Sequence, residues 1–222
     1  MRLSSPIYKL KRRAKHLARN SQIPLHEALN TVAKTEGFRG WSHLASQHSK
    51  TTPATDILRQ LRPGDMVLIA ARAGQGKTLL GIELAALAPK AKRQGYFYTL
   101  DYTKPDVRNH LETLGFDPTV SAQSVVVDTS DNICATYIID SFAGAAKHAL
   151  IVVDYLQILD QRRSTPALGE QIEMLKTFAT DHGAIIVMIS QIDRSFDLSA
   201  MAIPGLDDIR LPNQVDMSLF EI

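Results

Sequence analysis

The sequence predicts an α/β protein, in which a small helical module precedes a doubly wound, mostly parallel β-sheet. Three observations lead to this prediction. Apolar runs of strand length alternate with helical patterns from residue 56 onward, a glycine-rich loop joins the first run to a helix, and basic residues are concentrated near the N-terminus. The chain has 222 residues, 45% hydrophobic and 22% charged, a composition typical of folded globular proteins.

The first fifty residues form a strongly basic segment. They contain ten Lys and Arg against two Asp and Glu, a formal charge of +8, while the rest of the chain carries −6. Apolar residues at helical spacing predict helices over 6–19 and 24–36, and Ser42 is a good N-cap for a short third helix. We therefore predict a basic helical module over 1–50, a polar linker over 51–55 and a core over 56–222.

Strands and helices alternate along the predicted core. The expected strands are continuous apolar runs at 65–71, 95–100, 124–128, 184–190 and 216–222, and the run at 149–159 is expected to be a buried strand and its exit. The expected helices lie between them at 78–87, 105–114, 133–147 and 168–182. Unbroken apolar runs indicate strands that are covered on both faces, as in a parallel sheet flanked by helices.

Residues 71–78 (ARAGQGKT) match the phosphate-binding pattern G-x-x-x-x-G-K-[ST], except that Ala71 replaces the first glycine. Glycines allow the tight turn that points backbone N–H groups at phosphate oxygens, and the following helix N-terminus favours negative charge. The lysine reaches the β- and γ-phosphates, and the hydroxyl can bind Mg²⁺. The predicted nucleotide-binding residues are Ala73, Gly74, Gln75, Gly76, Lys77, Thr78 and Leu79.

Asp154 ends the buried run at 149–154. An acid at the carboxyl end of a central strand faces the ligand crevice of a doubly wound sheet. There it can hold Mg²⁺ together with Thr78. The alternative is an aspartate that caps a helix, but its occurrence beside a phosphate loop favours the metal site. We therefore predict a bound nucleoside triphosphate with Mg²⁺.

Four segments resemble the C-terminal ATPase domain of DnaB-type replicative helicases, which has a RecA-like fold. They are residues 63–78 with the phosphate loop, 153–159 (VDYLQIL), 189–195 (ISQIDRS) and 208–216 (DIRLPNQVD), in the order of the family. The resemblance covers about 160 residues of the core and implies a RecA-like P-loop ATPase. Residues 1–50 resemble no family that we can name.

The resemblance also implies roles for two polar residues. Gln191 would sense the γ-phosphate or the attacking water from the end of its strand. Asp101 occupies the position of the family's catalytic glutamate. Because its side chain is one methylene shorter, a shift of about 1 Å in reach can cost on the order of a hundredfold in rate. Asp101 can alternatively cap the helix that follows it.

The family's arginine finger, which reaches the γ-phosphate of the neighbouring subunit, has no counterpart here. Its aligned position is Ile203, although Arg194 or Arg210 could substitute. Such an arginine contributes about 10³- to 10⁵-fold in rate. The family's later strands and N-terminal domain are also not evident, which argues against a processive hexameric helicase.

The basic N-terminal helix is a candidate nucleic-acid contact. The predicted residues are Lys9, Lys11, Arg12, Arg13 and Lys15, with Arg162 and Arg163 in the loop that follows Asp154. Such a helix can neutralise several backbone phosphates. The alternatives are a solvated basic face or a surface that docks on the acidic core or on a partner protein, and for the arginine pair a solvated loop.

These observations leave three hypotheses. The first is a cytoplasmic, Mg²⁺-dependent ATPase that acts on DNA, as a homo-oligomeric ring or filament and without membrane contact. The second is an ATP-binding switch or adaptor that turns over slowly. The third is a DNA- or partner-binding protein whose core serves as an oligomerisation platform. The single cysteine, Cys134, excludes an internal disulfide and favours a reducing compartment.

Overall fold

The computed structural model describes residues 3–5, 7–48, 52–116, 125–142, 148–162, 164–193, 196, 204–210 and 215–221, without the side chains of 7–9, 47 and 48. The chain divides into two compact units, Met1–Thr52 and Pro53–Ile222. Residues 53–55 of the predicted linker are in fact helical, because helix α4 (Pro53–Gln60) begins at Pro53. Proline is favourable in a first helical turn, where no backbone N–H partner is needed.

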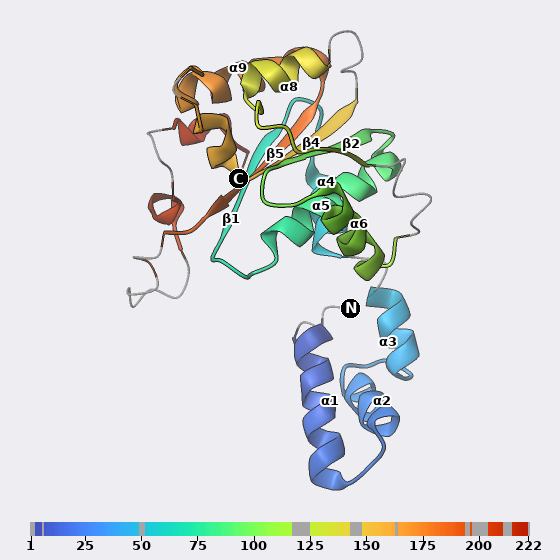
Figure 1. Ribbon diagram of the computed structural model, residues 1–222. Helices are drawn as coiled ribbons and strands as arrows, with labels where there is room; N and C mark the ends of the chain where they lie inside the picture. Colours follow the sequence, from blue (N-terminus) through green and yellow to red (C-terminus); the bar gives the residue numbers. More distant parts are fainter. Residues whose placement is uncertain are drawn as a thin grey trace. The chain divides into compact units, whose positions relative to one another are not determined.

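The N-terminal unit consists of three helices, α1 (Ile7–Ser21), α2 (Leu25–Thr35) and α3 (Trp41–His48), drawn in blue in Figure 1. Each contributes apolar residues to one small core, including Leu10 of α1, Val32 of α2 and Leu44 of α3. The Asn30 side chain accepts a hydrogen bond from Trp41 N at 2.9 Å, which fixes the start of α3. The three predicted helices are thus present, with the ends of the first two shifted by one or two residues, but Ser42 is not the N-cap of the third helix, because α3 already begins at Trp41.

The second unit is built on a five-stranded sheet in which every strand pair is parallel. The strands are β1 (Met66–Ala71), β2 (Gln94–Thr99), β3 (Val125–Asp128), β4 (Ala149–Asp154) and β5 (Ile185–Gln191), in the spatial order β1-β5-β4-β2-β3. The chain therefore crosses over the sheet repeatedly, as the predicted doubly wound fold requires.

Helices cover both faces of this sheet (Figure 1). Helices α4, α5 (Lys77–Leu87) and α6 (Lys104–Thr113) cover one face, and α8 (Ala135–Ser141) and α9 (Leu168–His182) cover the other. Successive residues of β4 belong to opposite cores: Ile151 and Val153 pack toward α8 and α9, whereas Leu150 and Val152 pack toward α5. This double burial explains why the strand sequences are continuously apolar.

The structure differs from the predicted elements at three places. The expected last strand, 216–222, is a short 3₁₀ turn, η5 (Met217–Leu219), followed by a single parallel bridge from Glu221 to Val67. The Asp216 side chain accepts a hydrogen bond from Ser218 N, and this local bond favours the turn. The run at 149–159 forms, as expected, a buried strand, β4, and its exit, which is the 3₁₀ helix η2 (Leu156–Asp160).

The helix expected over 133–147 is the shorter α8, and residues 143–147 lie outside the described part. Helix α4 was not predicted, although Ala54, Ile57, Leu58 and Leu61 follow a helical spacing and pack against the core. In the described ranges, no helix combines the length and apolarity needed to cross a membrane.

Candidate nucleotide-binding site

The predicted site residues meet at the carboxyl ends of the central strands. The sheet register places Ala71 beside Gln191, Ile189 beside Asp154, and Asp154 beside Thr99. A cavity of about 340 Å³ opens at this edge. It is lined by Ala73, Gly74, Gly76, Lys77, Thr78, Leu79, Asp101, Tyr102, His110, Asp154, Tyr155, Ile189 and Gln191. Of the predicted nucleotide-binding residues, Gln75 is the one that does not line it.

The loop between β1 and α5 has the backbone conformation that its glycines allow. Gly74 and Gly76 adopt φ angles of +74° and +81°. Residues that have a Cβ atom rarely adopt such positive φ angles. Gly76 is the N-cap of α5, so the free N–H groups of the first helical turn open onto the cavity. A Cβ atom at either glycine would meet no heavy atom within 4 Å. Both glycines therefore border open space of the kind an anion can occupy.

Lys77 and Thr78 begin α5 directly behind these glycines. The Lys77 ammonium donates to the carbonyl oxygen of Arg72 at 2.9 Å, so its side chain folds over the loop. Burial lowers the pKa of Lys77, and the nearby Asp154 carboxylate opposes that shift. The lysine is consequently a partly desolvated cation at the mouth of the loop, where an anionic ligand would be bound strongly.

Asp154 is 4% exposed and is held at the end of the central strand β4. Burial raises the pKa of Asp154 to about 6, the Thr78 hydroxyl lowers it by hydrogen bonding, Asp101 raises it and Lys77 lowers it. Asp154 Oδ2 is buried and has no hydrogen-bond partner among the described residues. The helix-capping alternative is wrong, because the N-cap of the following helix η2 is Tyr155.

The unpaired carboxylate oxygen fits a divalent cation. Buried polar atoms are nearly always satisfied, so an orphan acceptor beside a hydroxyl indicates a ligand position. Mg²⁺ is commonly bound by one or two protein oxygens, with phosphate and water supplying the rest. Accordingly, the described residues contain no cluster of three or more His, Cys, Asp or Glu that would hold a metal by itself. Thr78 and Asp154 are the donors that would hold Mg²⁺.

Asp101 lies on the wall formed by the connection from β2 to α6 and is exposed. Its backbone N–H donates to Thr99 Oγ1 at 3.2 Å. It does not cap α6: the N-cap is Thr103, whose hydroxyl accepts from Asp106 N while the Asp106 carboxylate accepts from Thr103 N. The capping alternative for Asp101 is therefore excluded, and its carboxylate is available to the cavity.

A hydrogen-bond network ties the 208–210 segment to the end of β5. Arg210 N donates to Gln191 O at 2.7 Å, and Gln157 Nε2 donates to Arg210 O at the same distance. The Ser190 hydroxyl also donates to Arg210 O, at 3.2 Å. These bonds hold the backbone that presents Gln191 to the cavity. Arg210 itself is exposed and is not among the residues that line the cavity.

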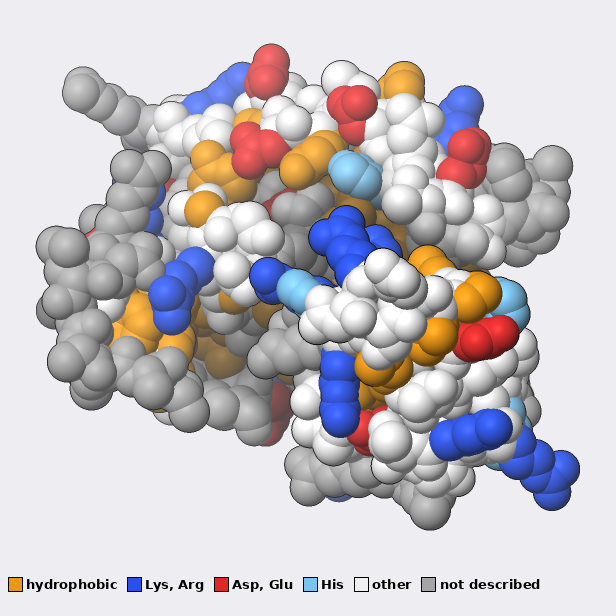
Figure 2. Space-filling model, turned by 90° about the horizontal axis from the view of Figure 1, so that it is seen from below, with side chains coloured by type: hydrophobic (Ala, Val, Ile, Leu, Met, Phe, Trp, Pro, Cys, Tyr) orange, Lys and Arg blue, Asp and Glu red, His pale blue; other side chains and the backbone are white. Residues whose placement is uncertain are grey.

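The predicted nucleic-acid residues lie mainly on α1. Lys11, Arg12, Lys15 and Arg19 are exposed and share one face of the helix by their spacing, opposite the buried Leu10 and Ala14. On the side of the molecule seen in Figure 2, exposed Lys and Arg side chains lie scattered among uncharged ones. Arg19 was not singled out from the sequence, although it lies four residues after Lys15.

Arg13 differs from the other basic residues of α1. Hydrogen bonds from Ser4 lower the pKa of Glu36, and Arg13 lowers it further, so this arginine faces an acid of its own module. Arg162 is exposed in the loop after η2. Arg163, Arg194 and Ile203, and the side chain of Lys9, lie outside the described part of the chain.

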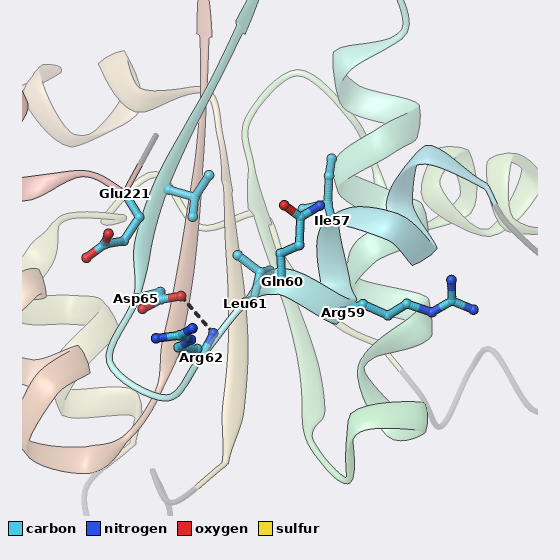
Figure 3. A pocket seen from close by; sticks show the side chains of 8 residues that line it. Ile57, Arg59, Gln60, Leu61, Arg62, Asp65 and Glu221 are labelled. Carbon is cyan, nitrogen blue, oxygen red and sulfur yellow. Dashed lines mark hydrogen bonds between the residues drawn. The ribbon is translucent and has the colours of Figure 1, made fainter. Parts of the chain in front are cut away.

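A second hollow, of about 730 Å³, lies along the outer edge of β1 and contains none of the predicted site residues (Figure 3). Its lining mixes apolar side chains such as Ile57 with charged ones such as Arg62 and Glu221. Asp65 Oδ2 accepts a hydrogen bond from Arg62 N at 2.7 Å, which fixes the turn that leads into β1. The hollow is therefore a feature of the sheet edge and is not part of the candidate nucleotide-binding site.

Sequence reasoning did not assign four of the residues that line the phosphate cavity to the site: Tyr102, His110, Tyr155 and Ile189. Tyr102 and Tyr155 directly follow the predicted Asp101 and Asp154, so proximity in sequence could have pointed to them. His110 lies beyond the middle of α6, and no pattern in the sequence marks it as a site residue.

No protein-family model matches the chain. Over 198 residues the chain is 24% identical to the replicative DNA helicase DnaB of Leifsonia xyli subsp. xyli, a match that covers 74% of this chain and 43% of that protein. The chain therefore spans less than half the length of this relative.

Two solved structures have a similar fold. A DnaB-like replicative helicase, described with its interactions with primase, matches 94% of this chain and 64% of that chain, with a TM-score of 0.60 and 16% identity. The ATPase domain of G40P matches 77% of this chain and 74% of that chain, with a TM-score of 0.58 and 18% identity. The resemblance predicted from the sequence is thus confirmed, and the chain carries a RecA-like α/β fold of the DnaB ATPase type.

Proposed function

We propose that the protein binds ATP with Mg²⁺ and hydrolyses it, as a DnaB-like ATPase that acts on DNA. The observation that carries this proposal is the shared cavity, which brings Lys77, Thr78, Asp101, Asp154 and Gln191 together with the two positive-φ glycines of the loop. These residues come from α5, β4 and β5, from the β1–α5 loop and from the connection between β2 and α6. An ordinary strand-to-helix turn would not require a buried, unpaired carboxylate opposite its lysine.

Hydrolysis in this cavity is an in-line displacement at the γ-phosphorus. The water oxygen forms a bond to phosphorus, the bond from phosphorus to the β–γ bridging oxygen breaks, and ADP leaves with that electron pair. The water proton passes to the Asp101 carboxylate, while Gln191 orients the water. Lys77 and the N–H groups of α5 stabilise the charge on the phosphate oxygens. Bound Mg²⁺, held by Thr78 and Asp154, would neutralise further phosphate charge.

We further propose DNA as the macromolecular partner. The basic stripe on α1 would contact the phosphate backbone, with Arg162 and Arg163 as additional contacts. The DnaB relative is a replicative DNA helicase, and this supports the choice of DNA. A homo-oligomeric ring or filament would place several such stripes along one strand. The single free cysteine, Cys134, favours a cytoplasmic setting.

A second candidate function is an ATP-binding switch that hydrolyses slowly. Asp101 is a shorter acid than the glutamate of the resembled family, and Arg210 does not line the cavity among the described residues. Both observations favour weak turnover in the isolated chain. Under this alternative, nucleotide binding would change the affinity for DNA or for a protein partner without strand separation.

Steady-state phosphate release separates the two functions. The full chain is assayed with Mg²⁺ and ATP alone, with single-stranded DNA and with duplex DNA, and strand separation is followed on a forked substrate. Stimulated hydrolysis with strand separation supports the ATPase motor, and ATP binding without turnover supports the switch. Lys77→Ala is the control, because removal of the ammonium should abolish both binding and turnover. ATP binding that survives in this variant unchanged would contradict both functions.

A further inference from the structure

We propose that His110 contacts the γ-phosphate of a bound nucleoside triphosphate, as a second donor in the cavity besides Lys77. This inference rests on the proposed function and assigns a role to a residue outside the phosphate-loop pattern. Among the described residues that line the cavity, Lys77 and His110 are the two that can carry positive charge. They lie on different elements, Lys77 at the start of α5 and His110 in the second turn of α6.

The position of His110 is fixed by the packing of α6. Val107 and Leu111, three residues before and one residue after His110, are fully or nearly fully buried in the core shared with α5. The capping box of Thr103 and Asp106 holds the first turn of the helix. A helix anchored at its start and along one face holds its side chains in a defined direction.

Aromatic contact fixes the ring itself. The imidazole of His110 and the ring of Tyr102 lie edge to face, with centroids 5.4 Å apart and planes at 70°. Both rings line the cavity together with Asp101. The wall formed by these three residues comes from the connection of β2 with α6, whereas the phosphate loop comes from the connection of β1 with α5.

The chemistry of the site requires a donor on this wall. The loop and α5 provide N–H groups and Lys77, but all of these donors come from the connection of β1 with α5, whereas Asp101 and Asp154 contribute acceptor oxygens to the same cavity. Negative charge on the terminal phosphate oxygens needs further donors there. An imidazole N–H can donate in either tautomer. Arg210 does not line the described cavity, and although the Tyr102 hydroxyl on this wall can also donate, His110 is the side chain there that can carry positive charge, so we assign the γ-phosphate contact to it.

The test compares the affinities for ADP and for a non-hydrolysable ATP analogue, both with Mg²⁺, by titration calorimetry on the full chain. His110→Phe keeps an aromatic ring beside Tyr102 but removes the donor, and His110→Gln retains a donor. We expect His110→Phe to lose about tenfold or more of the affinity for the triphosphate, with ADP affinity unchanged. His110→Gln should keep part of that preference, and Asn109→Ala, at an exposed neighbour on α6, should bind like the unaltered protein.

The outcomes separate this inference from the proposed function. An unaltered protein that binds neither nucleotide overturns the proposed function and the role of His110 with it. An unaltered protein that prefers the triphosphate, together with a His110→Phe variant that keeps the same preference, overturns the role of His110 alone. Unchanged ADP affinity in His110→Phe shows that the variant is folded, so a loss confined to the triphosphate supports the contact.

Discussion

At the scale of single residues, the buried carboxylate of Asp154 lowers the stability of the folded protein. Its carboxyl is buried, one of its oxygens has no partner, and burial raises its pKa to about 6. In the unfolded chain the same carboxyl has its ordinary pKa of 3.8. Above both values the folded protein must keep a desolvated charge that water would otherwise stabilise. Such a cost is expected where a cation is to be bound.

Replacement of Asp154 by Asn should therefore stabilise the protein in the absence of nucleotide and divalent cations. The raised pKa means that the folded state binds more protons between about pH 4 and 6, so the destabilisation by Asp154 grows across this window and is constant above it. The gain in free energy of unfolding at pH 7 should be up to about 3 kcal/mol. Urea denaturation at pH 3.5, 5 and 7 measures it. An equal gain at all three values would contradict the assigned pKa.

A substitution at Gly76 should lower nucleotide affinity much more than it lowers the stability of the fold. Gly76→Ala introduces a Cβ atom at a φ of +81°, which should cost about 1 kcal/mol of stability. The Cβ projects where no protein atom lies within 4 Å, so it would occupy the space assigned to phosphate. We expect nucleotide affinity to fall by at least tenfold while thermal unfolding shifts by only a few degrees. Affinity within twofold of the unaltered protein would argue that phosphate does not bind there.

At the scale of elements, the approach of α5 to the sheet sets the geometry of the site. A Cβ atom added to Gly95 of β2 would lie 2.0 Å from the Ala85 carbonyl oxygen of α5, a backbone atom that cannot move by itself. At Gly81 of α5 the nearest atom is Ile189 Cδ1, at 2.6 Å, the tip of a flexible side chain. The glycine in β2 therefore permits the close packing that places Lys77 and Thr78 over the strand ends.

Gly95→Ala should destabilise the protein by about 3 kcal/mol or more, because the whole helix must shift. Gly81→Ala should cost less, because Ile189 can change rotamer and alanine favours the helix by about 1 kcal/mol. Chemical denaturation of both variants gives the comparison. If Gly95→Ala proves the milder of the two, the close approach of α5 to β2 is not as described.

The sequence predicted most elements of the core, because buried parallel strands and amphipathic helices leave strong periodic signals. Errors occurred where local hydrogen bonds or weak patterns decided the structure. The apolar run at 216–222 looks like a strand, but the Asp216 side chain bonds to Ser218 N and turns the chain. Helix α4 was not predicted, because the polar residues before Asp56 resemble a linker, although the later residues of the helix pack on the core.

The site was predictable to a similar extent. The loop pattern and the strand ends identified Lys77, Thr78, Asp154 and Gln191, because parallel topology brings such ends together. His110 could not be found in this way, since its place in the cavity depends on how α6 packs against α5. The sequence also could not decide whether Asp101 caps α6. That question depended on Thr103, which forms the capping box instead.

At the scale of the whole molecule, the two units carry net charges of opposite sign. The first fifty residues carry a formal +8, while the remaining residues carry −6. Four of the basic side chains, Lys11, Arg12, Lys15 and Arg19, share one exposed face of α1. A basic stripe on one unit and a nucleotide cavity on the other suit a protein that holds a polyanion with one unit and ATP with the other.

The triple substitution Lys11→Ala, Lys15→Ala and Arg19→Ala should therefore weaken binding to single-stranded DNA. Because each neutralised phosphate contributes about 0.7 to the slope of log affinity against log salt, the slope should become shallower by about 2. Fluorescence anisotropy between 50 and 200 mM salt measures it. Lys90→Ala with Lys92→Ala, exposed in the other unit, is the control. A slope that the triple substitution leaves unchanged would favour a protein partner for this stripe.

If the turn at Gly74–Thr78 and Asp154 bind a nucleoside triphosphate with Mg²⁺, titration calorimetry of the folded full chain should detect that binding. We expect saturable binding of ATP at one site per chain, which weakens strongly when Mg²⁺ is chelated and disappears in Lys77→Ala. The absence of binding heat at several temperatures, for a protein whose circular dichroism shows it to be folded, would show that this turn is not a triphosphate site.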